Sequence, residues 1–153
     1  MPREGEAVAV GATGRLRHLV REEDGAARWG NDVPVLATPV LLWLGEIAAM
    51  RAVDEALGTG EMTVGRSHDA EHLAATPVGW TVEVTAVLAE VVGRSLHFTV
   101  QAHDGQDLVY RGTHVRARVS QERFLQRLAD KSGGATTLRV PSDGVPTGGL
   151  PGR

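Results

Sequence analysis

One carboxylate interrupts the most apolar stretch of this sequence. Glu46 lies within ATPVLLWLGEIAAM, residues 37–50, and no other charged residue stands between Pro39 and Met50. An ionised carboxylate on a buried face is costly unless it is paired or hydrogen-bonded. Glu46 is therefore either a structural acid with backbone or arginine partners, or a general base held in an apolar site. In the second case, a histidine within reach would complete an acid–base pair.

Two histidines in the polar segment GRSHDAEHLAATPVG, residues 65–79, are candidates for that pair. A strand conformation places His68, Ala70 and His72 on one face. His68 and His72 would then lie roughly 13 Å apart, which is too far to bind one metal ion, so no metal site is expected. We interpret His68 as a solvated residue at the sheet edge. His72 is expected where the strand enters the core, because apolar residues follow it.

A long helix is predicted to carry Glu46. Thr38 suits the N-cap, where its hydroxyl would accept a backbone N–H of the first turn. Pro39 suits the first helical position, and Gly58 suits the residue that follows the helix, which should run to about Leu57. The first half of this helix is apolar nearly all round, which indicates burial on most sides.

The rest of the ordered chain is predicted to form an antiparallel sheet. The glycines in VAVGATGRL, within residues 7–20, lack the third glycine of a dinucleotide-binding fingerprint, and we interpret this segment as an edge strand. Alternation with a period of two predicts strands over residues 62–74, 80–92, 96–102 and 108–120, followed by a short helix over residues 121–131. A strand, a buried helix and a four-stranded meander predict an α+β fold in which an antiparallel sheet curls round the helix. This arrangement resembles the hot-dog fold.

Length and composition fit one domain. The chain has 153 residues, of which 42% are apolar and 23% charged, so one packed core can form. We predict an ordered domain over residues 1–131 and a disordered tail, rich in Gly and Pro, over residues 132–153. The open edges of so small a sheet favour pairing as a homodimer, and a tetramer is the alternative.

Composition also excludes several classes of function. A net charge of −3 gives no electrostatic reason to expect nucleic acid or an anionic membrane as a partner. The absence of cysteine excludes disulfides, thiolate metal sites and a cysteine nucleophile. The first residues show no signal-peptide pattern, and the longest apolar run, residues 39–45, is far shorter than the roughly 20 residues that span a bilayer. We expect a soluble, cytoplasmic protein.

Three segments resemble the fluoroacetyl-CoA thioesterase family of hot-dog enzymes. They are LATPVLLWLGEIAAMRA (36–52), VGRSHDAEHLAATPVG (64–79) and AHDGQDLVYRGTHVRARV (102–119). The resemblance implies a thioester hydrolase that acts on a small acyl-CoA and needs no cofactor, with Thr38, Glu46 and His72 as the catalytic set. It also implies substrate contact for Gly65 and Arg116. The alternatives are a strand bulge at Gly65 and a solvated position on the outer face of the last strand for Arg116.

The predicted helix separates two members of this set. Thr38 and Glu46 lie roughly 12 Å apart along one helix, so we predict a site at a dimer interface that draws on both chains. Asp32 stands where the fluoroacetate-specific enzyme has a gating phenylalanine, so the resemblance does not extend to fluoroacetyl-CoA as the substrate. Trp43 is a candidate wall of a different acyl pocket. Two other functions are compatible with these residues: a non-catalytic module that binds acyl-CoA or an acyl carrier, and a hot-dog dehydratase.

Overall fold

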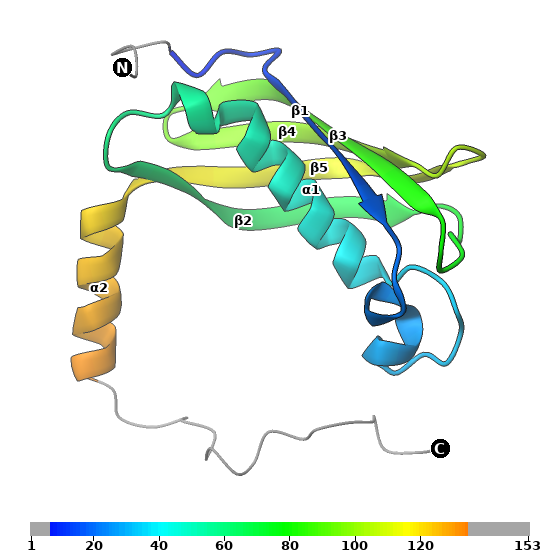
Figure 1. Ribbon diagram of the computed structural model, residues 1–153. Helices are drawn as coiled ribbons and strands as arrows, with labels where there is room; N and C mark the ends of the chain where they lie inside the picture. Colours follow the sequence, from blue (N-terminus) through cyan, green and yellow to red (C-terminus); the bar gives the residue numbers. More distant parts are fainter. Residues whose placement is uncertain (1–6, 135–153) are drawn as a thin grey trace.

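The computed structural model describes residues 7–134 as one antiparallel sheet with a long helix against it (Figure 1). The elements are β1 (Thr13–Leu19), α1 (Thr38–Val53), β2 (Glu61–His72), β3 (Thr81–Val92), β4 (Ser95–His103), β5 (Leu108–Ser120) and α2 (Gln121–Gly133). Three short 3₁₀ turns, η1 (Glu22–Asp24), η2 (Ala26–Trp29) and η3 (Asp54–Ala56), flank α1. The predicted α+β hot-dog fold is confirmed.

The order of strands in the sheet is β1-β3-β4-β5-β2. The strands β3, β4 and β5 form a meander, and β1 and β2 lie at the two edges, as Figure 1 shows. Because β2 pairs only with β5, its other side presents unpaired backbone N–H and C=O groups. The pairing of β2 with β5 shifts register between Gly65 and Ser67, which marks a bulge.

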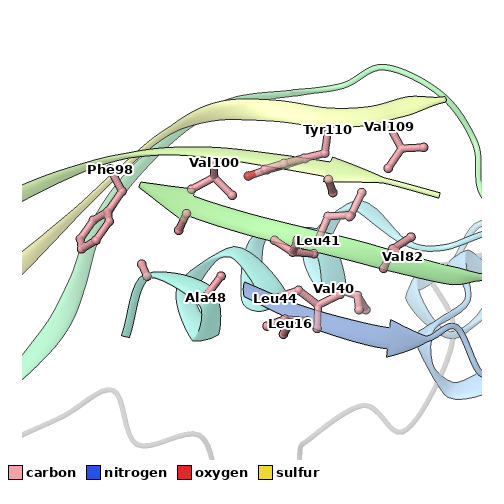
Figure 2. Packing of buried hydrophobic residues seen from close by; sticks show 14 of the residues in the cluster. Leu16, Val40, Leu41, Leu44, Ala48, Val82, Phe98, Val100, Val109 and Tyr110 are labelled. Carbon is pink, nitrogen blue, oxygen red and sulfur yellow. The ribbon is translucent and has the colours of Figure 1, made fainter. Parts of the chain in front are cut away.

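The core lies between α1 and the inner face of the sheet (Figure 2). Residues of α1 at helical spacing face inward and are buried: Val40, Leu41, Leu44, Ala48, Ala49 and Val53. They meet alternate residues of β3 and β4, as the sequence predicts: Val82, Val84, Ala86, Leu88, Leu96, Phe98, Val100 and Ala102. Full burial of each large apolar side chain contributes about 1.5–3 kcal/mol, so these contacts fix α1 over the sheet.

The first turn of α1 differs from the prediction. Ala37 occupies the N-cap position, no side chain caps the helix, and Thr38 is the first helical residue. The predicted N-cap role of Thr38 is therefore wrong, because its hydroxyl is hydrogen-bonded elsewhere. At the other end, α1 changes to the 3₁₀ turn η3 after Val53, so the α-helix is shorter than predicted.

The chain beyond β5 continues as α2, which extends away from the sheet in Figure 1. This helix was predicted to end at residue 131 and ends at Gly133. The remainder of the predicted disordered tail, from residue 135, lies outside the described residues. Among residues 7–134, no helix is both long and apolar enough to cross a membrane.

The close approach of β1 to α1 depends on Gly14. A Cβ atom at this position would overlap the Ala48 carbonyl oxygen and lie 2.7 Å from the Ala52 backbone nitrogen. We expect Gly14→Ala to lower the free energy of unfolding by about 1–3 kcal/mol, because the helix backbone must move to make room. Urea unfolding measures this change.

A matched control is Gly133→Ala, whose added Cβ meets no atom within 4 Å. Alanine is also the better helix former, so this variant should be as stable as the wild type or slightly more so. Equal stability of the two variants would contradict the packing described for β1.

Candidate active site

The predicted site residues form two separate groups along α1. Thr38 in the first turn contacts His72 at the end of β2. Glu46, about two turns further on, contacts the middle of β2 and β5. A single chain therefore brings together Thr38 with His72, and Glu46 with Gly65 and Arg116, but it does not join the two groups.

The first group is a hydroxyl–imidazole pair. The Thr38 hydroxyl oxygen lies 2.7 Å from Nδ1 of His72. Burial lowers the pKa of His72 more than the nearby Ala74 backbone raises it, so the imidazole is neutral near pH 7. Within residues 7–134, Nε2 of His72 is the one buried side-chain nitrogen or oxygen atom without a hydrogen-bond partner. A buried polar atom without a partner is costly, which marks this nitrogen as a site for a ligand or water.

A cavity of about 260 Å³ opens beside this pair. Its lining combines both members of the pair with apolar residues and two larger side chains before α1: Ala26, Trp29, Asn31, Val35, Leu36, Ala37, Thr38, Pro39 and His72. Asp32 lines a different cavity, on the other side of this segment. Trp43 is about half exposed and does not line this cavity, and its role as a wall of an acyl pocket stays a prediction.

A buried link from the segment after β2 sets the distance between Thr38 and His72. The Thr76 carbonyl accepts a hydrogen bond from the backbone N–H of Leu36 at 2.8 Å. The Thr76 hydroxyl donates a hydrogen bond to the Asp104 carboxylate at 3.0 Å. Thr76 is fully buried and Asp104 is 8% exposed. Thr76 thus holds Leu36, two residues before Thr38, close to the segment that follows His72. It also links both segments to the turn between β4 and β5.

The carboxylate of Asp104 is ionised in spite of its burial. Burial raises the pKa of Asp104, but the backbone N–H groups of Asp107 and Gln106 and the Thr76 hydroxyl outweigh this effect, and the net pKa is lowered. Sequence reasoning missed this support. The signal was present in the motif AHDGQD, where an Asp before Gly can accept the backbone N–H groups of the turn that follows it.

The second group surrounds the Glu46 carboxylate. Its Oε1 accepts a hydrogen bond from Nε2 of His68 at 3.1 Å and lies 3.9 Å from Nη1 of Arg116. A Cβ atom at Gly65 would overlap this oxygen and lie 3.3 Å from the carboxylate carbon. Glycine is therefore required at residue 65 for Glu46 to lie against β2. The predicted bulge at Gly65 is also present, so the two interpretations of this residue are compatible.

Arg116 lies on the inner face of β5, where it is 3% exposed. Its Nε and Nη2 donate to the hydroxyl and carbonyl of Thr63 at 2.8 and 3.0 Å. The alternative prediction of a solvated outer-face residue is wrong, because polar partners on β2 and α1 satisfy the guanidinium inside the fold. Desolvation lowers the pKa of Arg116, and the carboxylates of Glu46 and Asp54 oppose this shift.

Two stacked imidazoles complete the second group. The rings of His68 and His114 lie 4.1 Å apart at an interplanar angle of 13°. His114 donates from Nδ1 to the Ser67 carbonyl at 2.9 Å, and its Nε2 lies 3.3 Å from Nη1 of Arg116. His68 lies on the edge strand β2, as predicted, with its side chain 24% exposed; its hydrogen bond with Glu46 was not predicted.

The geometry of this group does not favour a metal ion. Ligand atoms of Glu46, His68 and His114 all lie within 4.8 Å of one another. However, a ring nitrogen binds metal in the plane of its ring, and two nearly parallel rings 4.1 Å apart do not converge on one point. The guanidinium of Arg116 also faces Nε2 of His114 and Oε1 of Glu46, where it would repel a cation.

Comparison with known proteins assigns the family. A family model described as fluoroacetyl-CoA-specific thioesterase matches residues 20–122, which include every residue of both groups. A fluoroacetyl-CoA thioesterase of Streptantibioticus cattleyicolor is 40% identical over 117 residues, which cover 76% of this chain and 82% of that protein.

Solved structures agree with this assignment. A structure of the fluoroacetyl-CoA thioesterase FlK aligns with a TM-score of 0.73 at 35% identity over 80% of this chain and 96% of that one. A threonine-to-serine variant of the same enzyme, in complex with acetyl-CoA, aligns with a TM-score of 0.75 at 34% identity over 81% and 98%. A hot-dog-like protein of Thermanaerovibrio acidaminovorans, 24% identical with a TM-score of 0.77 over 82% and 94%, shares the fold. The predicted family and enzyme class are thereby confirmed, and the chain belongs to the fluoroacetyl-CoA thioesterase family of hot-dog thioester hydrolases.

Proposed function

We propose that this protein hydrolyses a small acyl-CoA thioester to the free acid and coenzyme A. The observation that carries the proposal is the Thr38–His72 hydrogen bond at the wall of a 260 Å³ cavity, with an unpartnered His72 nitrogen beside it. A binding module would have no use for a neutral imidazole bonded to an accessible hydroxyl. Hydrolysis needs such a group to move protons.

Each member of the catalytic set has a distinct role in this reaction. The Glu46 carboxylate attacks the thioester carbon, directly or through a water molecule that it deprotonates. Thr38 orients the acyl group, and its backbone N–H, which no side chain caps, donates to the carbonyl oxygen as negative charge develops there. When the C–S bond breaks, the electron pair stays with sulfur, and the thiolate takes up the proton lost by the attacking water, which the neutral His72 imidazole accepts and passes on. In the direct route, that water cleaves the mixed anhydride formed between Glu46 and the acyl group, which releases the free acid and restores the carboxylate.

The two groups meet across a dimer in this proposal. The free edge of β2 can pair with β2 of a second copy, antiparallel and centred near Ala70. His68 of one chain then lies opposite the partner's His72, since the two residues are equally far from Ala70 on either side of it. This pairing brings Glu46, which is bonded to His68, beside the hydroxyl–imidazole pair of the other chain. The half-exposed Trp43 on α1 would become covered at the same interface.

The cavity lining favours a small acyl group, without specifying fluoroacetate. The named relatives are thioesterases for fluoroacetyl-CoA, and one was crystallised with acetyl-CoA. In this chain Asp32 lines another cavity, and Trp29 and Asn31 line the one beside Thr38. We infer that these two side chains set the size and polarity of the acyl group. The same reaction could also hydrolyse an acyl thioester on a carrier protein. Activity assays with both kinds of thioester distinguish the two substrates.

Thiol release from a panel of short, branched and aryl acyl-CoAs tests the reaction. We expect Glu46→Gln and His72→Ala to lower kcat/KM by about 100-fold or more, because each removes a group that transfers protons or attacks carbon. Glu122→Gln and His103→Ala, which make the same changes at exposed positions, should match the wild type.

Product analysis separates the competing functions in the same experiment. A change in enoyl absorbance without thiol indicates a dehydratase. Saturable binding of acyl-CoA with no product indicates a binding module. Either result, or full activity in both site variants, would contradict the proposed hydrolysis.

Complementation tests whether the site spans two chains. Neither Glu46→Gln nor His72→Ala should be active alone, but a 1:1 mixture that exchanges subunits should regain about a quarter of the wild-type activity. Half of the dimers are then mixed, and each mixed dimer has one intact site of two. No recovery, in a mixture shown by mass spectrometry to contain mixed dimers, would place the whole site within one chain.

Chelation tests the expectation that no metal takes part. The stacked rings and the guanidinium beside Glu46 are poorly arranged to bind a cation, so dialysis against EDTA should leave kcat and KM unchanged. The control is the dialysed enzyme with Zn²⁺ or Mg²⁺ restored. Loss of activity that the metal reverses would overturn this part of the proposal.

A further inference from the structure

His68 is hydrogen-bonded to Glu46 but belongs to neither the catalytic set nor the predicted substrate contacts. Its Nε2 donates to Oε1 of Glu46 at 3.1 Å, which is the only side-chain hydrogen bond of that carboxylate among residues 7–134. The contact with Arg116 is longer, at 3.9 Å, and reaches the same oxygen. The orientation of the carboxylate therefore depends on His68 more than on any other side chain.

We propose that His68 is a positioning residue, which holds Oε1 of Glu46 so that Oε2 is directed at the thioester. Both contacts are made to Oε1, and the second oxygen stays available for the substrate or for water. This inference rests on the proposed thioesterase function. It adds a residue that acts through Glu46 and does not itself touch the acyl group.

The His68 ring is held by stacking. It lies against His114, whose two nitrogens are both engaged, one by the Ser67 carbonyl and the other by Arg116. Desolvation lowers the pKa of His114, and the hydrogen bond with the Ser67 backbone opposes this shift only in part, so this ring is neutral near pH 7. A neutral, doubly fixed imidazole offers a flat surface that sets the plane of the His68 ring without repelling it.

Titratable or charged groups face His68 from each element packed against it. They are Glu46 on α1 and His114 and Arg116 on β5, and Asp54 on η3 lies near enough to Arg116 to affect its pKa. With His114 neutral, the charges are one guanidinium and two carboxylates. The hydrogen bond from His68 to Glu46 therefore gives the carboxylate its direction, and the longer contact with Arg116 supplies compensating charge.

The bulge in β2 is what turns His68 toward the helix. Before the register shift, the odd-numbered residues Thr63 and Gly65 lie on the inner face of the sheet, beside Arg116 and Glu46. After the shift, the even-numbered residues His68 and His72 lie on the inner face and contact residues of α1. One extra residue in the strand reverses which residues face inward. The same feature thus leaves room for Glu46 at Gly65 and places the imidazole that binds it.

Two substitutions separate the hydrogen bond from the stacking. His68→Phe keeps an aromatic ring against His114 and removes the donor. His68→Gln removes the ring and retains an N–H near the position of Nε2. We expect His68→Phe to lower kcat by roughly 10- to 100-fold with little change in KM, as for loss of a hydrogen bond to a charged group. His68→Gln should recover most of the lost activity.

A double-variant cycle with Glu46→Gln supplies the readout that a merely structural role would not give. In the Glu46→Gln background, His68→Phe should have no further effect on residual activity, because there is no carboxylate left to position. Thermal unfolding of each variant serves as the control for folding. Long-range ¹H–¹⁵N correlations should show a proton on Nε2 of His68.

The outcomes distinguish this inference from the proposed function. If the wild type releases thiol and His68→Phe matches it, or if His68→Phe causes the same loss with and without Glu46, the positioning role is wrong and the thioesterase stands. A His68 ring that carries no proton on Nε2 would also overturn it. If the wild type releases no thiol from any acyl-CoA, the proposed function fails first and the positioning role falls with it.

Discussion

The contact of the Glu46 carboxylate with the sheet is the constraint on which the rest of the site depends. An acid in an apolar helix needs a partner, and here the partners come from β2 and β5: a histidine donor, a buried guanidinium and a glycine that leaves space. Arg116 in turn needs acceptors, which Thr63 supplies. The inner face of the sheet is therefore apolar over β3 and β4 and polar where β2 meets β5. Contacts with this polar region fix the rotation of α1 about its axis and its position along the sheet.

A second network fixes the other half of the site. Thr76 joins the chain before α1 to the turn between β4 and β5 through a backbone and a side-chain hydrogen bond. It thereby holds the start of α1 against the end of β2, where the hydroxyl of Thr38 meets the imidazole of His72. The two halves are about 12 Å apart along one rigid helix, so no small movement within the chain can unite them. A second copy at the free edge of β2 can.

Periodicity predicted most of the fold, because the apolar alternation of β3 and β4 and the nearly uncharged first half of α1 leave few alternatives. It failed at residues whose partners lie far away in the sequence. Thr38 is a good N-cap by type, but its hydroxyl bonds to His72, 34 residues on. Arg116 looks like a surface residue by type, but it is 3% exposed and donates to Thr63 inside the fold. The bulge in β2 turns His68, on the edge strand, toward Glu46. The catalytic set came from family resemblance. Homodimerisation, cytoplasmic location and the division at residue 131 stay predictions.

The most direct test of the central claim is a crystal structure with an acyl-CoA analogue that has an amide in place of the thioester. The account predicts that the analogue binds at a dimer interface, with its carbonyl group within roughly 3 Å of Glu46 from one subunit and of Thr38 from the other. That arrangement would show that the carboxylate in the apolar helix serves chemistry. An analogue bound beside Thr38 and His72 with Glu46 remote in both subunits would contradict it, and Glu46 would then be a structural acid.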